Sequence, residues 1–269
     1  SFAQQQDSWS YQYYNTSHGL PSSQIITLAK DSKGFLWLGT AVGLSMYDGY
    51  SFQNYPYAKE NELIGYVNVI KADAANRLWI GSGAGLFCYV NNEIIKVSLA
   101  TALPQGVNDI AADANGTIWL ATENGPVKFN ITDVDFTGKK KIMLAGHLLK
   151  QWDLKNEIID KRRAVLISKA GDGTVYIAGQ NTLFKLIGDK LEKVFDIADS
   201  RNKILSLFPV NKSTVYFDAA STEINKIENG IAFYSNPEKL YKPNTDNLPG
   251  IWYAGTRGAF NFHPQNGII

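Results

Sequence analysis

Few residues of this chain stand at the spacings that a catalytic or metal site requires. The three histidines, His18, His147 and His263, are scattered along the chain, and no Ser/His/Asp nucleophile motif accompanies them. Cys88 is the only cysteine and lies in an apolar run. We expect it to be a buried, inert thiol, because a single cysteine can form neither an internal disulfide nor a cysteine-based zinc site. The sequence therefore predicts no catalytic residue, no metal and no cofactor.

Aspartate and tryptophan recur together at a regular spacing. The two series are Asp31, Asp73 and Asp113, and Trp37, Trp79 and Trp119. Each aspartate opens a polar turn, and each tryptophan stands in the short apolar run that follows. The acids could suggest calcium and the aromatic rings could suggest sugar stacking. However, acids about 40 residues apart would each cap their own turn, and tryptophans within apolar runs should be buried between neighbouring sheets.

The spacing of this pattern predicts the fold. Weaker copies are centred on Tyr176, Tyr216 and Trp252, which makes six units with a period near 40 residues. That period is typical of a four-stranded propeller blade. The strands expected in the first unit are 23–29, 35–38, 44–47 and 51–55. Both faces of such a sheet must be covered by neighbours. We therefore predict an all-β chain, a β-propeller of six or seven four-stranded antiparallel blades forming one domain over residues 1–269.

Two segments depart from the repeat. About 17 extra residues lie between 130 and 163, and we expect this insertion to form an outer hairpin or a protruding loop. Residues 8–14 alternate aromatic side chains, as an edge strand does. We expect this N-terminal strand to pair with the last unit, beside residues 260–262, and to close the ring.

A ligand would meet the turns that follow the aromatic strands, because these turns reach one face of the disc near its axis. The informative turn residues are Glu123, Asn124, Asn181 and Arg257. Trp9 and Trp152 fall outside the repeat and are the better candidates for exposed aromatics, and Trp152 is taken as a candidate ligand contact. The four turn residues and Trp152 are the candidate ligand-binding residues. The alternative for the four turn residues is that they are simply solvated.

Composition excludes several classes of function. The 269 residues carry a net charge of +1, with 45% hydrophobic and 19% charged residues, so a nucleic-acid-binding surface is not expected. No apolar run approaches the roughly 20 residues that span a bilayer. The chain begins Ser1-Phe2-Ala3, which is compatible with a mature secreted protein or with an expression product.

The first unit resembles a known family of repeats. The segments that carry the resemblance are Gly19-Leu20-Pro21-Ser22-Ser23, Leu36-Trp37-Leu38-Gly39-Thr40 and Tyr47-Asp48-Gly49-Tyr50-Ser51-Phe52. They are similar to the two-component regulator propeller repeat, as found in periplasmic sensors of hybrid two-component systems of Bacteroides-type bacteria. The similarity continues to about residue 129 and then weakens, since tyrosine replaces tryptophan at positions 176 and 216.

The resemblance implies a non-catalytic periplasmic sensor, the N-terminal part of a longer ectodomain whose parent chain carries the histidine kinase. Its implied partners are a glycan-derived oligosaccharide, other domains of the parent chain and a second copy of the chain. Ligand would act by shifting domain or dimer geometry. Two alternatives stay open: a propeller enzyme, either a lyase or a hydrolase acting on polysaccharide, and an interaction module of a secreted or cell-surface complex.

Overall fold

The chain folds as an all-β protein in the computed structural model. The structure describes residues 13–98, 106–123, 125–144, 148–152, 165–179, 182–188, 190–196 and 204–219, and beyond these only the strands between 224 and 268. The helical elements in the described part are two short 3-10 turns, Thr16–His18 and Lys59–Asn61. None of the described helices is long and apolar enough to cross a membrane.

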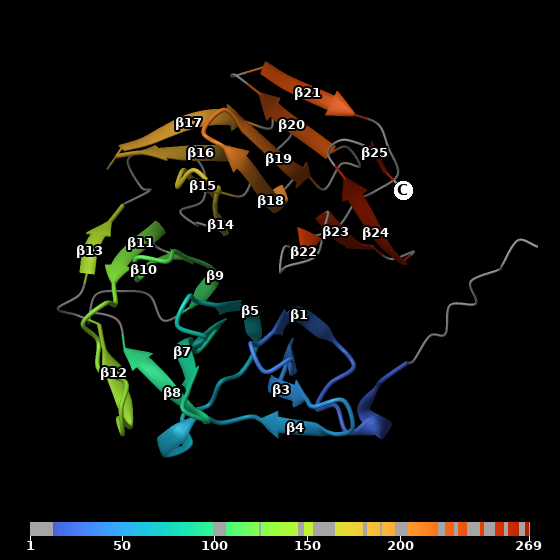
Figure 1. Cartoon of the computed structure of the whole chain (residues 1–269), viewed down its shortest axis with the longest axis vertical. Helices are drawn as coiled ribbons and strands as arrows, with labels where there is room; N and C mark the ends of the chain where they lie inside the picture. The colour runs from blue at the N-terminus through green and yellow to red at the C-terminus, as the bar shows by residue number, and fades with distance from the viewer. Residues whose placement is uncertain are drawn as a thin grey trace, which may run out of the picture.

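Six sheets follow one another around a common centre (Figure 1). We call them blades 1 to 6 and call the four strands of each blade A to D, from the centre outward. Blade 1 consists of β1 (Ile25–Lys30), β2 (Leu36–Thr40), β3 (Gly43–Tyr47) and β4 (Phe52–Tyr55). Blade 2 consists of β5 (Val67–Ala72), β6 (Leu78–Ser82), β7 (Gly85–Val90) and β8 (Glu93–Ser98). Blade 3 consists of β9 (Val107–Ala112), β10 (Thr117–Thr122), β11 (Gly125–Asn130) and β13 (Leu148–Gln151).

The remaining three blades keep the same order. Blade 4 consists of β14 (Leu166–Lys169), β15 (Val175–Ala178), β16 (Thr182–Ile187) and β17 (Lys190–Asp196). Blade 5 consists of β18 (Ile204–Asn211), β19 (Thr214–Ala219), β20 (Ile224–Glu228) and β21 (Ile231–Ser235). Blade 6 consists of β22 (Pro243–Asn244), β23 (Ile251–Gly255), β24 (Gly258–His263) and β25 (Gly267–Ile268). The predicted six units of four antiparallel strands are confirmed. The predicted closing strand at residues 8–14 lies almost wholly outside the described residues.

The repeated tryptophans are buried between blades, as predicted. Trp37 and Trp79 are fully buried and Trp119 is 5% exposed. Small residues two positions later let neighbouring blades approach each other. A Cβ atom on Gly39 would lie 2.6 Å from Val67 of blade 2, and one on Gly81 would lie 2.8 Å from Val107 of blade 3. The glycines are therefore required by the tight contact between blades.

The aspartates cap the turns between strands A and B. Asp31 Oδ1 accepts the backbone N–H groups of Lys33 and Phe35, both at 2.9 Å, while Oδ2 accepts the indole N–H of Trp37 at 2.9 Å. Asp73 makes the same contacts in blade 2, where its Oδ2 accepts from Trp79 at 2.8 Å. The sequence-based interpretation of these acids as turn caps is confirmed. One carboxylate thus fixes a turn and orients the ring that fills the gap between blades.

The insertion forms neither an outer hairpin nor a protruding loop where the structure describes it, so that expectation was wrong. Its strand β12 (Lys141–Met143) joins blade 2 as a fifth strand, parallel to β8, and β13 then returns as strand D of blade 3. We call residues 131–144 the strap. Ile142 is 3% exposed and Leu144 is fully buried, and both belong to the apolar core between blades 2 and 3. The strap therefore ties two neighbouring blades together at their outer edges.

Candidate ligand-binding face

The turns between strands B and C lie on the same face of the disc as the loops that connect one blade to the next. The registers show this, because the first residue of strand A pairs with the last residue of strand B: Ile25 with Thr40, and Val67 with Ser82. We call this side the BC face, and the side that carries the Asp turns the AB face. Glu123, the candidate turn residue that the structure describes, belongs to the BC face.

Hydroxyl side chains close the BC turns from inside. The hydrogen bonds are Thr40 Oγ1 to Gly43 O at 2.8 Å, Ser82 Oγ to Gly85 O at 3.3 Å and Thr122 Oγ1 to Gly125 O at 2.6 Å. All three hydroxyl residues are fully buried. They therefore shape the turns and are not available to a ligand. The glycine-rich run 81–85 thus contains the hairpin turn between β6 and β7.

Exposed apolar and aromatic side chains gather on the BC face of the first two blades. Val42 is 51% exposed in the first BC turn, and Tyr57, Leu63 and Tyr66 are 54%, 53% and 43% exposed in the loop that leads to blade 2. The Tyr66 carbonyl accepts the N–H of Gly83 at 3.1 Å, which fixes this tyrosine beside the second BC turn. Exposed rings on a firm backbone offer flat surfaces on which a sugar ring can stack.

Ion pairs hold the loop that carries these tyrosines. Lys59 Nζ lies 2.6 Å from Glu93 Oε2, and Lys96 Nζ lies 2.7 Å from Glu62 Oε2, so the loop is attached to β8 at two points. The hydrogen bond from Lys96 holds the pKa of the Glu62 carboxyl below its ordinary value. At the loop tip, Glu60 and Asn61 adopt positive φ angles of 60° and 56°. Positive φ angles are strained in residues other than glycine and are kept only where the surrounding structure holds them. Here the two ion pairs hold the loop in this conformation.

The structure brings only part of the predicted site together. Glu123 is exposed in the BC turn of blade 3, as expected for a ligand-facing residue. Trp9, Asn124, Asn181 and Arg257 lie outside the described residues. Trp152 is 4% exposed, so the expectation of an exposed aromatic was wrong. The backbone N–H of Trp152 donates to the carbonyl of Pro126 at 3.1 Å, directly after the end of β13.

Tyr57 and Tyr66 were missed by the sequence reasoning, which considered only aromatics within the repeated strands and the insertion. The available signal was the position of these tyrosines in a loop between two clear repeats. Aromatic residues there have no neighbouring blade to pack against. Exposure in the connecting loop thus distinguishes them from the buried tryptophans of the strands.

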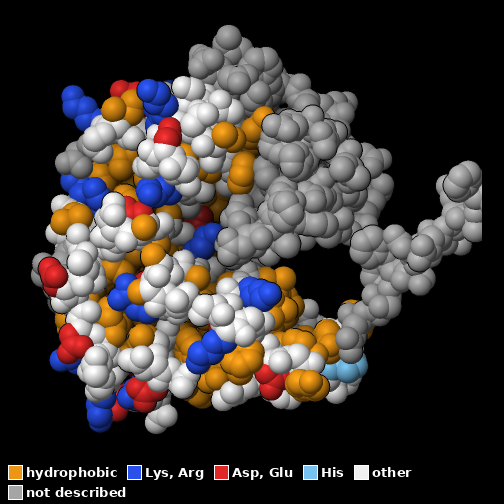
Figure 2. Space-filling view, viewed as in Figure 1, with side chains coloured by type: hydrophobic (Ala, Val, Ile, Leu, Met, Phe, Trp, Pro, Cys, Tyr) orange, Lys and Arg blue, Asp and Glu red, His pale blue; other side chains and the backbone are white. Residues whose placement is uncertain are grey.

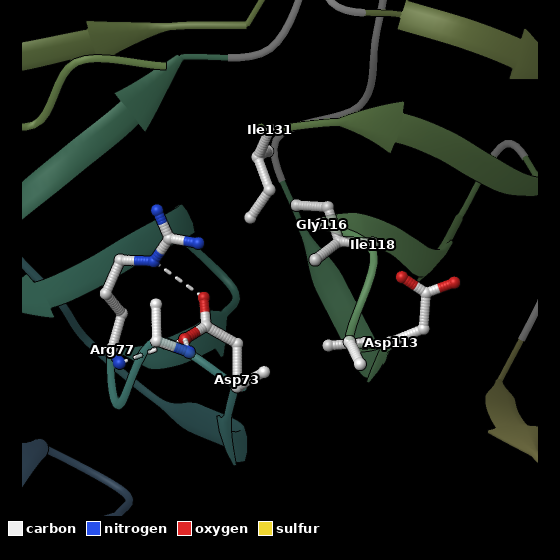
Figure 3. A pocket seen from close by; sticks show the side chains of 10 residues that line it. Asp73, Arg77, Asp113, Gly116, Ile118 and Ile131 are labelled. Atoms are coloured by element: carbon white, nitrogen blue, oxygen red, sulfur yellow. Dashed lines mark hydrogen bonds and ion pairs between the residues drawn. The ribbon is translucent and has the colours of Figure 1, made fainter. Parts of the chain in front are cut away.

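A small cavity opens on the opposite, AB face, between the Asp turns of blades 2 and 3 (Figure 3). Its volume is about 210 Å³, below the roughly 300 Å³ at which binding pockets usually begin. Asp73 and Arg77 line it but already bind each other, with 2.6 Å between Arg77 Nε and Asp73 Oδ2. The Arg77 guanidinium also stacks over the ring of Phe136 at 4.6 Å. The AB cavity is therefore a less suitable ligand site than the BC face.

Catalytic or metal-binding groups do not cluster in the described part of the chain. No group of three or more His, Cys, Asp or Glu side chains there could hold a metal ion. His18 is exposed, and its Nδ1 lies 2.8 Å from Asn15 Oδ1 within a helix cap. The Cys88 thiol is fully buried, and burial raises its pKa far above the ordinary value. The prediction of a buried thiol is confirmed.

Sequence comparison identifies the repeat. The family model described as the two component regulator propeller matches residues 19–41 and 103–124. These two segments are therefore similar to the two-component regulator propeller repeat. They cover the first two strands of blade 1 and the first two strands of blade 3, in each case with the AB turn that joins the strands. A comparison with curated protein sequences found no match.

Solved structures share the propeller fold. The extracellular domain of a one component system from B. thetaiotaomicron superposes with a TM-score of 0.73 at 15% identity, over 96% of this chain and 37% of that one. The extracellular domain of a hybrid two component system from the same organism gives 0.73 at 16%, over 96% and 36%. Virginiamycin B lyase from Staphylococcus aureus gives 0.65 at 14%, over 92% and 83%. The chain thus spans about a third of the length of these two extracellular domains.

Proposed function

We propose that this two-component regulator propeller is a non-catalytic, extracytoplasmic ligand-recognition domain of a signalling protein, and that it binds a glycan-derived oligosaccharide on its BC face. The repeat family and the likeness to the extracellular domains of two signalling proteins support the sensor role. The observation that carries the ligand class is the exposure of two tyrosines, Tyr57 and Tyr66, on the face that also carries the exposed Glu123.

The chemistry of this face suits binding rather than reaction. Tyrosine rings give stacking area at low entropic cost, and their hydroxyls hydrogen-bond to sugar hydroxyls. Asn124, Asn181 and Arg257 are proposed as further contacts from neighbouring BC turns. Binding would act by favouring one arrangement of this domain relative to other domains of a parent chain, or to a second copy, in the periplasm.

The test compares two tyrosines of the BC face with one tyrosine of the AB face. Thermal-shift and calorimetric titrations of a neutral oligosaccharide panel would be run on the wild-type chain, on Tyr57→Ala and Tyr66→Ala, and on the matched control Tyr50→Ala. Tyr50 is 96% exposed on the AB face. We expect the first two variants to weaken binding about tenfold, as loss of one stacking ring does, and the control to bind normally. Normal binding by all three variants, or binding of no oligosaccharide, would refute the proposal.

A propeller enzyme is the second candidate, supported by the fold likeness to virginiamycin B lyase. It would require basic and acidic side chains grouped over the axis. Incubation of the chain with polysaccharide panels, followed by chromatography for unsaturated or hydrolysed products, separates the two candidates. Any product that disappears when Glu123→Gln is introduced would favour the enzyme.

A further inference from the structure

Three side chains stand in one row across blade 3. The registers place Trp119 of β10 opposite Lys128 of β11, and Lys128 opposite Lys150 of β13. Directly paired residues share a face of a sheet, so the ring and both lysines project from the same side of blade 3. Trp119 belongs to the apolar cluster with Ile167 of blade 4. The lysines therefore face the boundary between blades 3 and 4.

A third lysine reaches the same place from blade 4. Lys169 Nζ lies 6.0 Å from the centre of the Trp119 ring, and Lys128 Nζ lies 5.7 Å from it. Lys150 Nζ lies 5.9 Å from the ring of Trp152. We call Lys128, Lys150 and Lys169 the lysine trio. All three side chains are half-buried, so their charges are less screened than those of fully exposed lysines.

The repeat itself does not require lysines at these positions. The equivalent rows read Trp37, Met46 and Gln53 in blade 1, and Trp79, Cys88 and Ile95 in blade 2. Uncharged side chains serve these positions in blades 1 and 2. Blades 4 and 5 place Lys185 opposite Tyr176 and Lys226 opposite Tyr216, but the next partners of these lysines are Glu192 and Phe233. Among blades 1 to 5, a lysine opposite a second lysine in this row is therefore particular to blade 3. Two like charges directly opposite each other on a sheet destabilise the pair. Blade 3 therefore carries a local cost that packing does not explain.

The described acids offset only part of this charge. Asp113 Oδ2 lies 3.9 Å from Lys169 Nζ, at the limit of an ion pair. Lys128 and Lys150 form no ion pair with any residue in the described ranges. Figure 2 shows acidic and basic side chains interspersed over the coloured part of one face. The trio and Asp113 together leave a local charge of about +2 at neutral pH.

A buried donor lacks an acceptor at the same place. The Nε1–H group of Trp119 has no hydrogen-bond partner in the part of the chain that the structure describes, although the residue is only 5% exposed. In blades 1 and 2 the same group donates to Asp31 and Asp73, at 2.9 and 2.8 Å. A buried donor left without an acceptor is destabilising. This donor and the trio both favour an acceptor with negative charge.

We infer that the blade 3–4 boundary at Trp119 is an anion-binding site for a sulfate or carboxylate group carried by an acidic oligosaccharide. The ammonium groups of the lysine trio supply the charge, and Trp119 Nε1–H donates the directional hydrogen bond. The saccharide part of this inference rests on the proposed function, whereas the anion site does not. It lies at the boundary between blades 3 and 4 near the AB turns, separate from the tyrosines of the BC face.

The indole N–H signals of the protein provide a direct readout. The ¹⁵N-labelled chain would be titrated at constant ionic strength with sodium sulfate, with a galacturonate trisaccharide and with neutral maltotriose, sodium chloride being the reference. Trp119→Phe assigns the signal. We expect sulfate and the galacturonate trisaccharide to move the Trp119 signal downfield with saturation, while Trp37 and Trp79 stay in place because Asp31 and Asp73 already bind them. An unmoved Trp119 signal in both titrations would overturn the site.

Charge variants locate the site and separate the two proposals. Lys128→Gln, Lys150→Gln and Lys169→Gln should each weaken sulfate binding about tenfold, and Lys128→Arg should retain it. Lys140→Gln, whose side chain is 72% exposed on the strap, is the matched control. Equal affinity in all four glutamine variants would refute the site. Saturable sulfate binding without galacturonate binding would keep the anion site and refute its saccharide assignment. Neutral sugar binding that depends on Tyr66 but not on the trio would support the BC face alone.

Discussion

The carboxylate of Asp73 accepts the indole N–H of Trp79 at 2.8 Å, and Asp113 has no such bond with Trp119. Both aspartates otherwise hold their turns through two backbone N–H groups. The two blades therefore differ in this side-chain hydrogen bond and in their ion pairs: Asp73 Oδ2 lies 2.6 Å from Arg77 Nε, whereas Asp113 Oδ2 lies 3.9 Å from Lys169 Nζ.

This difference predicts unequal costs for the same substitution. Asp73→Ala should lower the free energy of unfolding by about 3–5 kcal/mol, because it leaves Arg77 and the indole N–H unpaired in a buried place. Asp113→Ala should cost less, about 1–2 kcal/mol, since it removes mainly the cap of the turn. Urea unfolding followed by tryptophan fluorescence measures both. Equal costs would mean that the bond to Trp79 contributes nothing.

The strap should contribute to stability through Phe136. This ring is 7% exposed, lies edge-on to Trp79 with 5.9 Å between ring centres, and supports the guanidinium of Arg77. We expect Phe136→Ala to cost about 3 kcal/mol through the cavity that it creates. Met143→Ala, on the same strap at 55% exposure, should change stability by less than about 0.5 kcal/mol. A Phe136→Ala variant with unchanged stability would contradict the stabilising role of the strap.

Cys88 should report the opening of blade 2. Its thiol is fully buried and its pKa is raised by burial, so the native protein should not react with a thiol reagent such as dithionitrobenzoate at mildly alkaline pH. Urea should restore full reactivity. In Phe136→Ala the native labelling rate should rise, because Cys88 shares the apolar core with the strap. Rapid labelling of the unperturbed wild-type protein would show that this core opens readily.

Two tyrosines should make the fold sensitive to strongly alkaline pH. The hydrogen bond with Tyr14, together with burial, raises the pKa of Tyr47 to about 12, and burial beside Asp172 raises that of Tyr176 to about 12. In the unfolded chain both ionise near 10, so unfolding releases protons above that pH. The contribution of these two tyrosines to the free energy of unfolding is therefore fully present below about pH 10 and is lost as the pH rises toward about 12. Tyr176→Phe should reduce this loss in unfolding measurements across the range, and an unchanged slope would refute the assignment.

The junction of blades 3 and 4 depends on a carboxylate near the axis. Asp109 is 9% exposed, and its Oδ2 accepts the backbone N–H of Ile167 at 3.0 Å. We expect Asp109→Ala to cost about 2–3 kcal/mol, because the amide of Ile167 then loses its acceptor. Asn68→Ala, which removes the bond to Val107 O between blades 2 and 3, serves as comparison. Thermal unfolding of both variants would show whether the Asp109–Ile167 hydrogen bond contributes more to stability than the Asn68–Val107 hydrogen bond.

The blades could be predicted from the sequence because every blade must make the same tight turn and pack against its neighbours in the same way. A polar turn, a buried ring and a small residue recur wherever two sheets meet, so Asp31, Trp37 and Gly39 have copies that confirm one another. β12 had no such copy. Its three residues show no periodicity, and its parallel partner β8 lies more than 40 residues earlier in the chain. Long-range pairing of this kind leaves no local pattern.

The candidate site was less predictable for the same reason. Glu123 follows a repeated strand, so its exposed position could be inferred. Trp152 is covered by groups at the end of β13 that no repeat defines. The unpaired donor of Trp119 depends on where Asp113 Oδ2 points, and therefore on Lys169 of the next blade. Identical motifs can thus differ in chemistry when their neighbours differ.

The strap also affects how this protein can be divided. Because β12 completes blade 2 with residues that lie beyond the third strand of blade 3, the structural unit and the sequence repeat do not coincide there. Excision or exchange of blade 3 as a cassette would remove an edge strand from its neighbour and expose the apolar surface beneath Ile142 and Leu144. Shortened or chimaeric versions should therefore keep residues 67–152 as one inseparable segment.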